Sequence, residues 1–286
     1  MSFDDKDLGR LLDLLRTSAK AEVLPRYRAL SDGETEAKTA PDDLVTVADT
    51  GMEQAVADGL ARDFPDIELI GEEAVHETPA LLSRIGAAAR SVILDPIDGT
   101  WNFAHGMPAF GVIAAVVERG ETVAGIIYDP VWDDCVLARR GAGAWRQAPD
   151  GTRTPLAVAA PAPLAEMGGY VAPRLHPATE RAGLFACLTG LHRVQSLRCS
   201  AWEYRALASG AMAFGLTALL KPWDHAAGVL IHAEAGGVSR LLDGTPYNPT
   251  LTEGPMLSAP DEASWAALAE HFLTAAPGLV MQTTVS

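Results

Sequence analysis

A buried strand that runs directly into an acidic, proline-containing turn is the feature that most constrains this chain. The apolar run Ser91-Val92-Ile93-Leu94 is typical of a buried strand, and Asp95-Pro96-Ile97-Asp98-Gly99-Thr100 follows it at once. Two carboxylates therefore lie three residues apart around a stiff proline, just before a glycine and a hydroxyl residue. Such a segment can hold hard cations and bring backbone N–H groups close to a phosphate. Taken alone, it would indicate only a tight turn.

Other acids fall where predicted strands end or predicted helices begin. They are Asp49, Glu72, Glu73 and Asp224. Strand ends and helix starts meet at one edge of an α/β core, so these groups can converge with the acids of the turn. Several carboxylates in one place repel one another, and a bound cation is the usual remedy. Ligation by oxygen alone favours Mg²⁺ or Mn²⁺, and no His/Cys set with zinc spacing is present.

The last two residues of the turn suit a phosphate. Gly99 lacks the Cβ that would block close approach of the backbone. Thr100 is a candidate helix N-cap, and the N–H groups that follow it would form an anion site. Cations and a helix N-terminus that face one phosphate are a recurrent arrangement for phosphoryl transfer to water.

Composition excludes several classes of partner. The 286 residues are enough for one large or two medium domains, and 48% hydrophobic residues provide a sizeable core. A net charge of −15 without a basic cluster argues against nucleic acid and anionic membranes. The N-terminus does not have a signal-peptide pattern, no apolar run reaches spanning length, and the three scattered cysteines suggest a reducing compartment. We therefore expect a cytoplasmic protein.

The predicted elements divide the chain into two halves. Helices are expected at 8–23, 49–63, 178–191, 201–209, 223–235 and 262–275, and the polar segment 31–43 is expected to be an exposed loop. Strands are expected at 67–70, 91–94, 112–117, 123–128, 136–138, 167–172, 193–197, 213–220, 238–242 and 256–258. The pattern predicts a mostly antiparallel α+β domain over 1–152 and an α/β domain over 153–286.

Four segments together make the chain recognisable. They are Asp43-Leu44-Val45-Thr46-Val47-Ala48-Asp49, Gly71-Glu72-Glu73, the turn extended through Trp101-Asn102-Phe103, and Trp223-Asp224-His225-Ala226-Ala227-Gly228 leading to Glu234-Ala235-Gly236-Gly237. The chain resembles the inositol monophosphatase family, among the lithium-sensitive, Mg²⁺-dependent phosphomonoesterases. This resemblance implies a layered α-β-α-β-α fold, hydrolysis of a small polyol or sugar phosphate, and a homodimer.

The resemblance also implies a set of metal ligands. Glu72, Asp95 and the carbonyl of Ile97 would hold the first metal. Asp95, Asp98 and Asp224 would hold the second. Glu72 would also help to hold a third, weaker metal, so two or three Mg²⁺ ions per site are expected.

Catalytic roles follow from the same resemblance. Thr100, hydrogen-bonded to Asp49, would help to activate the attacking water, with Glu72 as a further catalytic acid and Glu73 in support. The N–H groups of Gly99 and Thr100 would bind the phosphate. Metal-activated water would attack in line, without a phosphoenzyme.

The chain departs from the family at the substrate-binding end. Arg198-Cys199-Ser200-Ala201 stands where inositol-specific members carry Gly-Ser/Thr-Ala-Ala, and Thr217 replaces a glutamate seven residues before Asp224. Arg198, Ser200 and Thr217 are the predicted substrate residues. Arginine suits a second anionic group on the substrate; equally, Arg198 could turn outward or pair with Glu203. The alternatives are therefore a 3′-phosphonucleotide phosphatase, a histidinol-phosphate phosphatase, or a non-catalytic regulatory protein that binds metal or phosphate.

Overall fold

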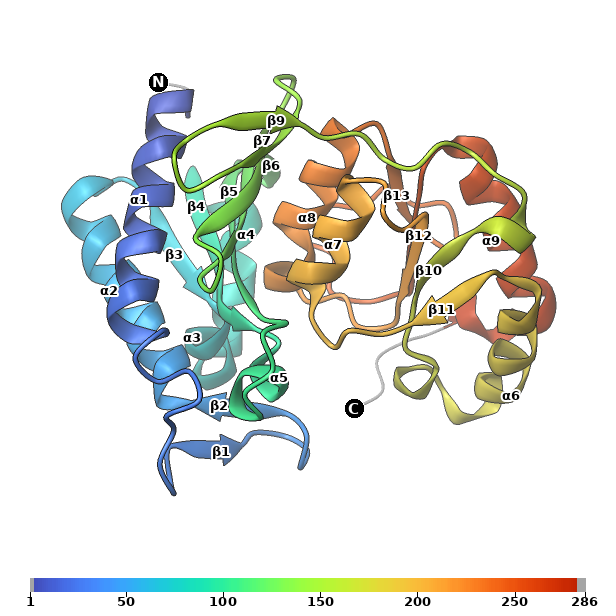
Figure 1. Cartoon of the computed structure of the whole chain (residues 1–286), viewed down its shortest axis with the longest axis horizontal. Coiled ribbons are helices and arrows are strands. Elements are labelled where there is room, and N and C mark those ends of the chain that lie inside the picture. The colour runs from blue at the N-terminus through green and yellow to red at the C-terminus, as the bar shows by residue number, and fades with distance from the viewer. Residues whose placement is uncertain (1–2, 282–286) are drawn as a thin grey trace.

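Five layers of helices and sheets make up the molecule (Figure 1). The computed structural model describes residues 3–281. Met1 and Ser2, the first residues of the segment that lacks a signal-peptide pattern, lie outside this range. Helices α1 (Asp5–Glu22) and α2 (Val47–Asp63) form the first layer. The predicted α-β-α-β-α layering is confirmed.

The first sheet has seven strands and follows chain order. Its strands are β3 (Glu68–Gly71), β4 (Arg90–Asp98), β5 (Gly111–Glu118), β6 (Glu121–Asp129), β7 (Asp134–Arg139), β8 (Ala144–Gln147) and β9 (Arg153–Pro155). Only the β3–β4 pair is parallel, so the predicted antiparallel character is confirmed. Because β9 pairs with β8, this sheet reaches Pro155; the division of the chain after residue 152 stays a prediction.

Both faces of this sheet are buried, and side-chain alternation along β4 shows why. Val92 and Leu94 pack toward α1 and α2, whereas Ile93 packs toward the helices on the opposite face. A strand covered on both faces needs a continuous apolar run, as seen before the acidic turn.

The second half supplies the other three layers. Helices α7 (Ser200–Ala208) and α8 (Pro222–Glu234) lie between the two sheets. The second sheet has the order β11-β10-β12-β14-β13, with the bounds β10 (Gly168–Val171), β11 (Arg193–Gln195), β12 (Phe214–Thr217), β13 (Val238–Leu241) and β14 (Met256–Ala259). Helices α6 (Ala178–Cys187) and α9 (Glu262–Ala275) cover its outer face.

Three local features of the structure correct the predictions around the acids. The 31–43 segment is not simply a loop, because β1 (Thr35–Ala37) pairs with β2 (Leu44–Thr46). The N-cap of α2 is Thr46 and not Asp49; Asp49 is the N3 residue of a capping box, which is why the helix starts two residues earlier than expected. The N-cap of α5 (Thr100–Ala104) is Gly99 and not Thr100. Gly99 has a left-handed backbone conformation, which only glycine adopts at low cost.

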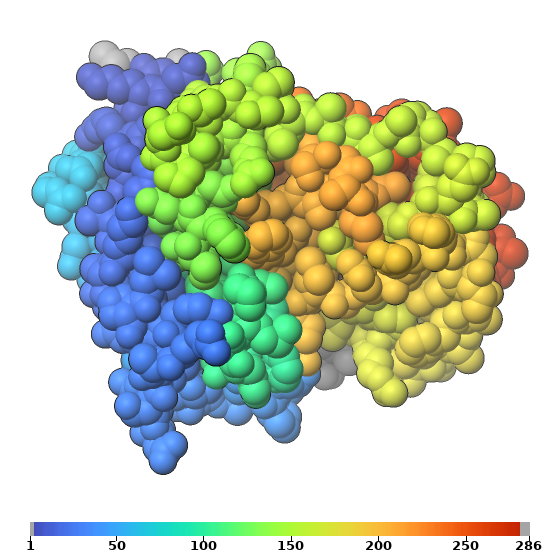
Figure 2. Space-filling model, viewed as in Figure 1, coloured from blue at the N-terminus to red at the C-terminus, as the bar shows by residue number. Residues whose placement is uncertain are grey.

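Short helical segments complete the connections. They are α3 (Glu72–Glu77), α4 (Arg84–Ala87) and the 3₁₀ turns η1 (Pro79–Ser83), η2 (Leu164–Glu166), η3 (Pro173–Leu175), η4 (Leu188–Gly190) and η5 (Pro277–Met281). None of the helices within residues 3–281 is both long and apolar enough to cross a membrane. In the space-filling view, the teal segment around α5 lies against the gold segment that leads into α7 (Figure 2). A side-chain amide supports this contact, since Asn102 Nδ2 donates to the carbonyl of Leu197 at 2.8 Å.

Candidate active site

A β-bulge places the two acids of the turn on one face of the sheet. Asp95 pairs with Ile113 and Asp98 pairs with Gly111, so three steps along β4 match two steps along β5. Residues three apart in a regular strand point to opposite faces, and one extra residue restores a common face. Pro96, which has no N–H to donate, lies inside the irregular stretch where none is needed.

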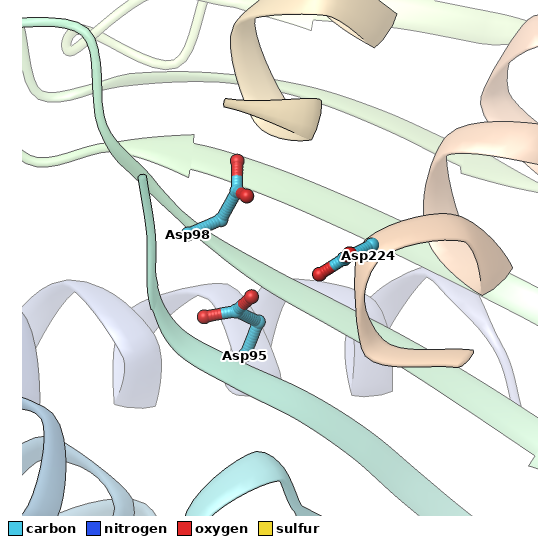
Figure 3. A group of neighbouring side chains, drawn as sticks. All are labelled: Asp95, Asp98 and Asp224. Carbon is cyan, nitrogen blue, oxygen red and sulfur yellow. The ribbon is translucent and has the colours of Figure 1, made fainter. Parts of the chain in front are cut away.

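The third acid comes from the helix layer. Asp224 lies in the first turn of α8, which starts at Pro222 and packs on the first sheet. One carboxylate oxygen each of Asp95, Asp98 and Asp224 lies within 4.8 Å of the others, and the three side chains converge from β4 and α8 (Figure 3). The structure thus brings together three of the five predicted metal-ligating residues.

The electrostatics of this triad favour a cation. Burial raises the pKa of Asp95 and Asp224 well above the usual range, and the neighbouring acids raise it further. Burial likewise raises the pKa of Asp98 to about 6, against hydrogen bonds from Cys199 Sγ at 3.0 Å and Ala201 N–H at 2.6 Å. No lysine or arginine among the described residues forms an ion pair with any of the three acids. Crowded oxygens without a cationic partner fit a hard divalent ion.

Asp49 and Thr100 lie together beside the triad. Thr100 Oγ1 lies 3.2 Å from Asp49 Oδ1 and 2.9 Å from the carbonyl of Ile97, and its single proton can serve one acceptor at a time. Asp49 Oδ2 accepts from the N–H and hydroxyl of Thr46 at 2.8 and 2.5 Å. Burial raises the pKa of Asp49 to about 7, so this carboxyl can exchange a proton near neutral pH.

Glu72 and Glu73 lie on α3 and share a cation that the sequence did not reveal. Lys38 Nζ donates to Glu72 at 3.0 Å and to Glu73 at 2.7 Å, and its side chain is 5% exposed. Burial alone would lower the pKa of Lys38, but these two carboxylates raise it above its ordinary value. Glu72 therefore lies close enough to the three-acid cluster to raise the pKa of its members, while its own carboxylate is paired with a lysine.

Two further residues that sequence reasoning missed hold the site in place. Glu53 accepts from the N–H groups of Glu73 and Ala74 at 3.0 and 2.9 Å, and so anchors α3 from α2. The sequence could have indicated this role of Glu53, because it lies one helical turn after Asp49 and therefore on the same face of α2. The thiol of Cys199 donates to Asp98. Nothing in the sequence indicated this contact, because the two residues are 101 positions apart and only the fold brings them together.

Gly99 leaves no room for a side chain. Its φ is +84°, and a Cβ there would lie 2.9 Å from the carbonyl of Ala109 and 3.2 Å from Cys199 Sγ. Only glycine therefore fits at this position without displacing its neighbours. The roles of the Gly99 and Thr100 N–H groups toward a phosphate stay predictions.

A cavity of about 210 Å³ opens beside the acids, and the predicted substrate residues line it. Arg198, Ser200 and Thr217 line it together with Asp98 and Asp224. Thr217 Oγ1 donates to the carbonyl of Leu219 at 3.2 Å. This places the predicted substrate end directly next to the acid cluster.

Arg198 does not pair with Glu203. Glu203 accepts from the N–H of Leu197 at 2.8 Å, and the Arg198 side chain turns away toward Asp42, with its guanidinium 4.5 Å from the Trp101 ring centre. Of the two alternatives to anion binding, the Arg198–Glu203 pair is therefore wrong, whereas an Arg198 side chain that turns outward agrees with its exposed position.

Known proteins match most of the chain. The family described as the inositol monophosphatase family matches residues 11–276. A fructose-1,6-bisphosphatase/inositol-1-monophosphatase of Thermotoga maritima is 31% identical over 222 residues, covering 74% of this chain and 77% of that protein. A histidinol-phosphatase of Chlorobaculum parvum is 32% identical over 205 residues, covering 68% and 71%. The solved structure of a Thermotoga maritima IMPase has a TM-score of 0.78 and 25% identity, covering 94% of this chain and 98% of that one.

Proposed function

The chain belongs to the inositol monophosphatase family of phosphatases, and we propose that it hydrolyses a small polyol or sugar phosphate with Mg²⁺ as its cofactor. The observation that carries the proposal is the convergence of three carboxylates that lack a cationic side-chain partner among the described residues. Two or three ions per site, with Mn²⁺ as a substitute, are part of the proposal, as are sensitivity to lithium and a homodimer.

The chain's own residues would divide the work. Asp95, Asp98 and Asp224 would hold Mg²⁺, together with Glu72 and the carbonyl of Ile97. When bound, the ions would lower the pKa of water and stabilise negative charge on the leaving oxygen.

Proton handling falls to the Asp49–Thr100 pair. The Thr100 hydroxyl can donate to Asp49 or to Ile97 O. It would therefore accept a proton from a water through a lone pair while it passes its own proton to Asp49. An Asp49 pKa of about 7 makes that acceptance possible near neutral pH. Gly99 allows the backbone N–H groups to approach the phosphate.

A panel of phosphate esters with and without Mg²⁺ tests the proposal. The panel contains inositol 1-phosphate, fructose 1,6-bisphosphate, histidinol phosphate and a 3′-phosphonucleotide, and released phosphate is measured. We expect Mg²⁺-dependent release that is fastest with the polyol or sugar esters. Release confined to histidinol phosphate would favour the second candidate, which the Chlorobaculum relative supports. No metal-dependent release from any ester would leave the regulatory alternative.

A further inference from the structure

Arg198 stands where the resemblance to inositol-specific members leads one to expect a glycine, and its side chain contacts Asp42 and Trp101. One guanidinium nitrogen, Nη2, lies 3.3 Å from the carbonyl of Asp42 and 3.2 Å from its carboxylate. The same guanidinium lies 4.5 Å above the Trp101 ring, which is a cation–π distance. One edge and one face of the guanidinium are therefore engaged by the N-terminal half of the chain.

Asp42 belongs to a compact turn that also carries Lys38. The N–H of Lys38 donates to the carbonyl of Asp43 at 2.7 Å, and the N–H of Asp43 donates to the carbonyl of Ala40 at 3.0 Å. Residues 38–43, here called the 38–43 turn, are thus closed on themselves between β1 and β2. A restraint on Asp42 is transmitted to Lys38 because the turn is a single hydrogen-bonded unit.

The Lys38 side chain holds the other end of the turn, in addition to the β1–β2 pairing that flanks it. Its ammonium lies between Glu72 and Glu73 and is almost completely buried, while Thr39, Pro41 and Asp42 are exposed. Apart from the β1–β2 pairing, the turn has two side-chain attachments, one to the acids of α3 and one to Arg198. The first attachment belongs to the N-terminal half, and the second reaches across from the segment that enters α7.

We propose that Arg198 is a positioning residue that straps the 38–43 turn across the site and keeps Lys38 between Glu72 and Glu73. Arg198 then holds the site together instead of binding a second anionic group of the substrate. This inference goes beyond the proposed function and does not depend on it, because the strap is a property of the folded chain.

The side chain of Lys38 gives the test a direct readout. Trypsin cleaves after lysine only when that lysine is accessible, so the strap should protect the Lys38–Thr39 bond. Full-length Arg198→Gln and Asp42→Asn are digested under native conditions, and the fragment that ends at Lys38 is quantified by mass spectrometry. Matched controls are Arg193→Gln and Asp32→Asn, which remove the same charges from exposed positions.

We expect both strap variants to accelerate cleavage after Lys38 by about threefold to tenfold, as suits an exposed ion pair with an added cation–π contact. The double variant should cleave no faster than either single variant, because both remove the same attachment. Digestion is repeated with Mg²⁺ and with EDTA, and the ranking of variants should be the same. Arg198→Gln and Asp42→Asn that cleave at the rate of their controls would overturn the proposal.

Kinetic measurements distinguish the proposed positioning role of Arg198 from recognition of a second anionic group on the substrate. With a strap, Arg198→Gln and Asp42→Asn change kcat/KM in the same direction and by the same factor for a monophosphate and a bisphosphate. If Arg198 instead bound a second phosphate, Asp42→Asn would free the guanidinium and improve the bisphosphate selectively, while Arg198→Gln would weaken it selectively. Opposite effects of this kind would overturn the proposal. These measurements require turnover, whereas the digestion does not, so failure of the proposed function and failure of the strap are distinguishable.

Discussion

The acidic residues of this site differ most in the groups that stabilise their negative charge. Glu72 and Glu73 share a lysine, and Asp98 accepts a thiol and a backbone N–H. Asp95 and Asp224 face mainly other acids, which raise their pKa in addition to burial. A neutral replacement therefore has opposite consequences for function and for the stability of the metal-free protein.

Asp224→Asn should abolish the proposed turnover without weakening the metal-free fold. Removing a ligand should lower phosphate release at least about a hundredfold, since loss of outer partners of a metal site already costs about 10–100-fold. In EDTA, the free energy of unfolding should stay level or rise, because one charge leaves a repulsive cluster. Urea titrations and phosphate assays check both parts, with exposed Asp66→Asn as the control. A less stable metal-free Asp224→Asn would contradict the account.

Glu203 provides a pH-dependent prediction. Burial raises the pKa of its carboxyl to about 7, so between about 4.5 and 7 the folded chain binds more protons than the unfolded chain. Stability from this group is therefore present at low pH and lost as the pH rises through 7. Glu203→Gln should gain about 1–3 kcal/mol over the wild type at pH 8 and nothing near pH 4. Urea unfolding at both pH values measures the difference, and a gain that is equal at the two values would refute it.

At the scale of elements, the site depends on short segments held by long ones. The six-residue helix α3 carries Glu72 but has no side-chain cap of its own. Glu53, from the seventeen-residue helix α2, supplies the missing acceptor for its first N–H groups. The position of a proposed metal ligand is thus set from a different helix.

Glu53→Ala should loosen α3. Two N–H groups would lose their acceptor, at a cost of about 1–3 kcal/mol in unfolding free energy. Mg²⁺ should also bind more weakly, because Glu72 is no longer held in place. Urea unfolding and calorimetric Mg²⁺ titration are the measurements, with Glu77→Ala on the exposed side of the same helix as the control. Equal stability of the two variants would show that α3 does not need this anchor.

The sequence predicted those elements whose signal is local. The helix at 262–275 has the predicted bounds. Asp95 and Asp98 lie at the end of a strongly apolar strand and Asp224 lies in the first turn of a predicted helix, and these three acids converge as expected. The contacts of Lys38 and Arg198 could not be predicted in this way. They join residues 34 to 156 positions apart, and the path of the intervening chain decides them.

At the scale of the whole molecule, the acid cluster joins two layers. Asp95 and Asp98 belong to the first sheet, and Asp224 belongs to the helix layer packed on it. A cation bound by all three would connect the layers, and the net charge of −15 would favour its approach.

Mg²⁺ should therefore raise the melting temperature. A concentration ten times the Kd adds about 1.4 kcal/mol by mass action, which corresponds to about 2–4 °C for a chain of this size. Thermal melts with Mg²⁺ and with EDTA measure the shift, and Asp95→Asn should reduce it to near zero. A shift of the same size in Asp95→Asn would place the stabilising ion elsewhere.

The single extra residue in β4 has a consequence for how such a chain can change. Shortening an exposed hairpin alters only its own tip, whereas deleting Pro96 or Ile97 would restore regular pairing between Asp95 and Asp98. The two acids would stay on one face of the sheet, but they would lie closer together along the strand and the irregular backbone between them would be lost. Both the length and the composition of this segment therefore determine how its two acids are spaced.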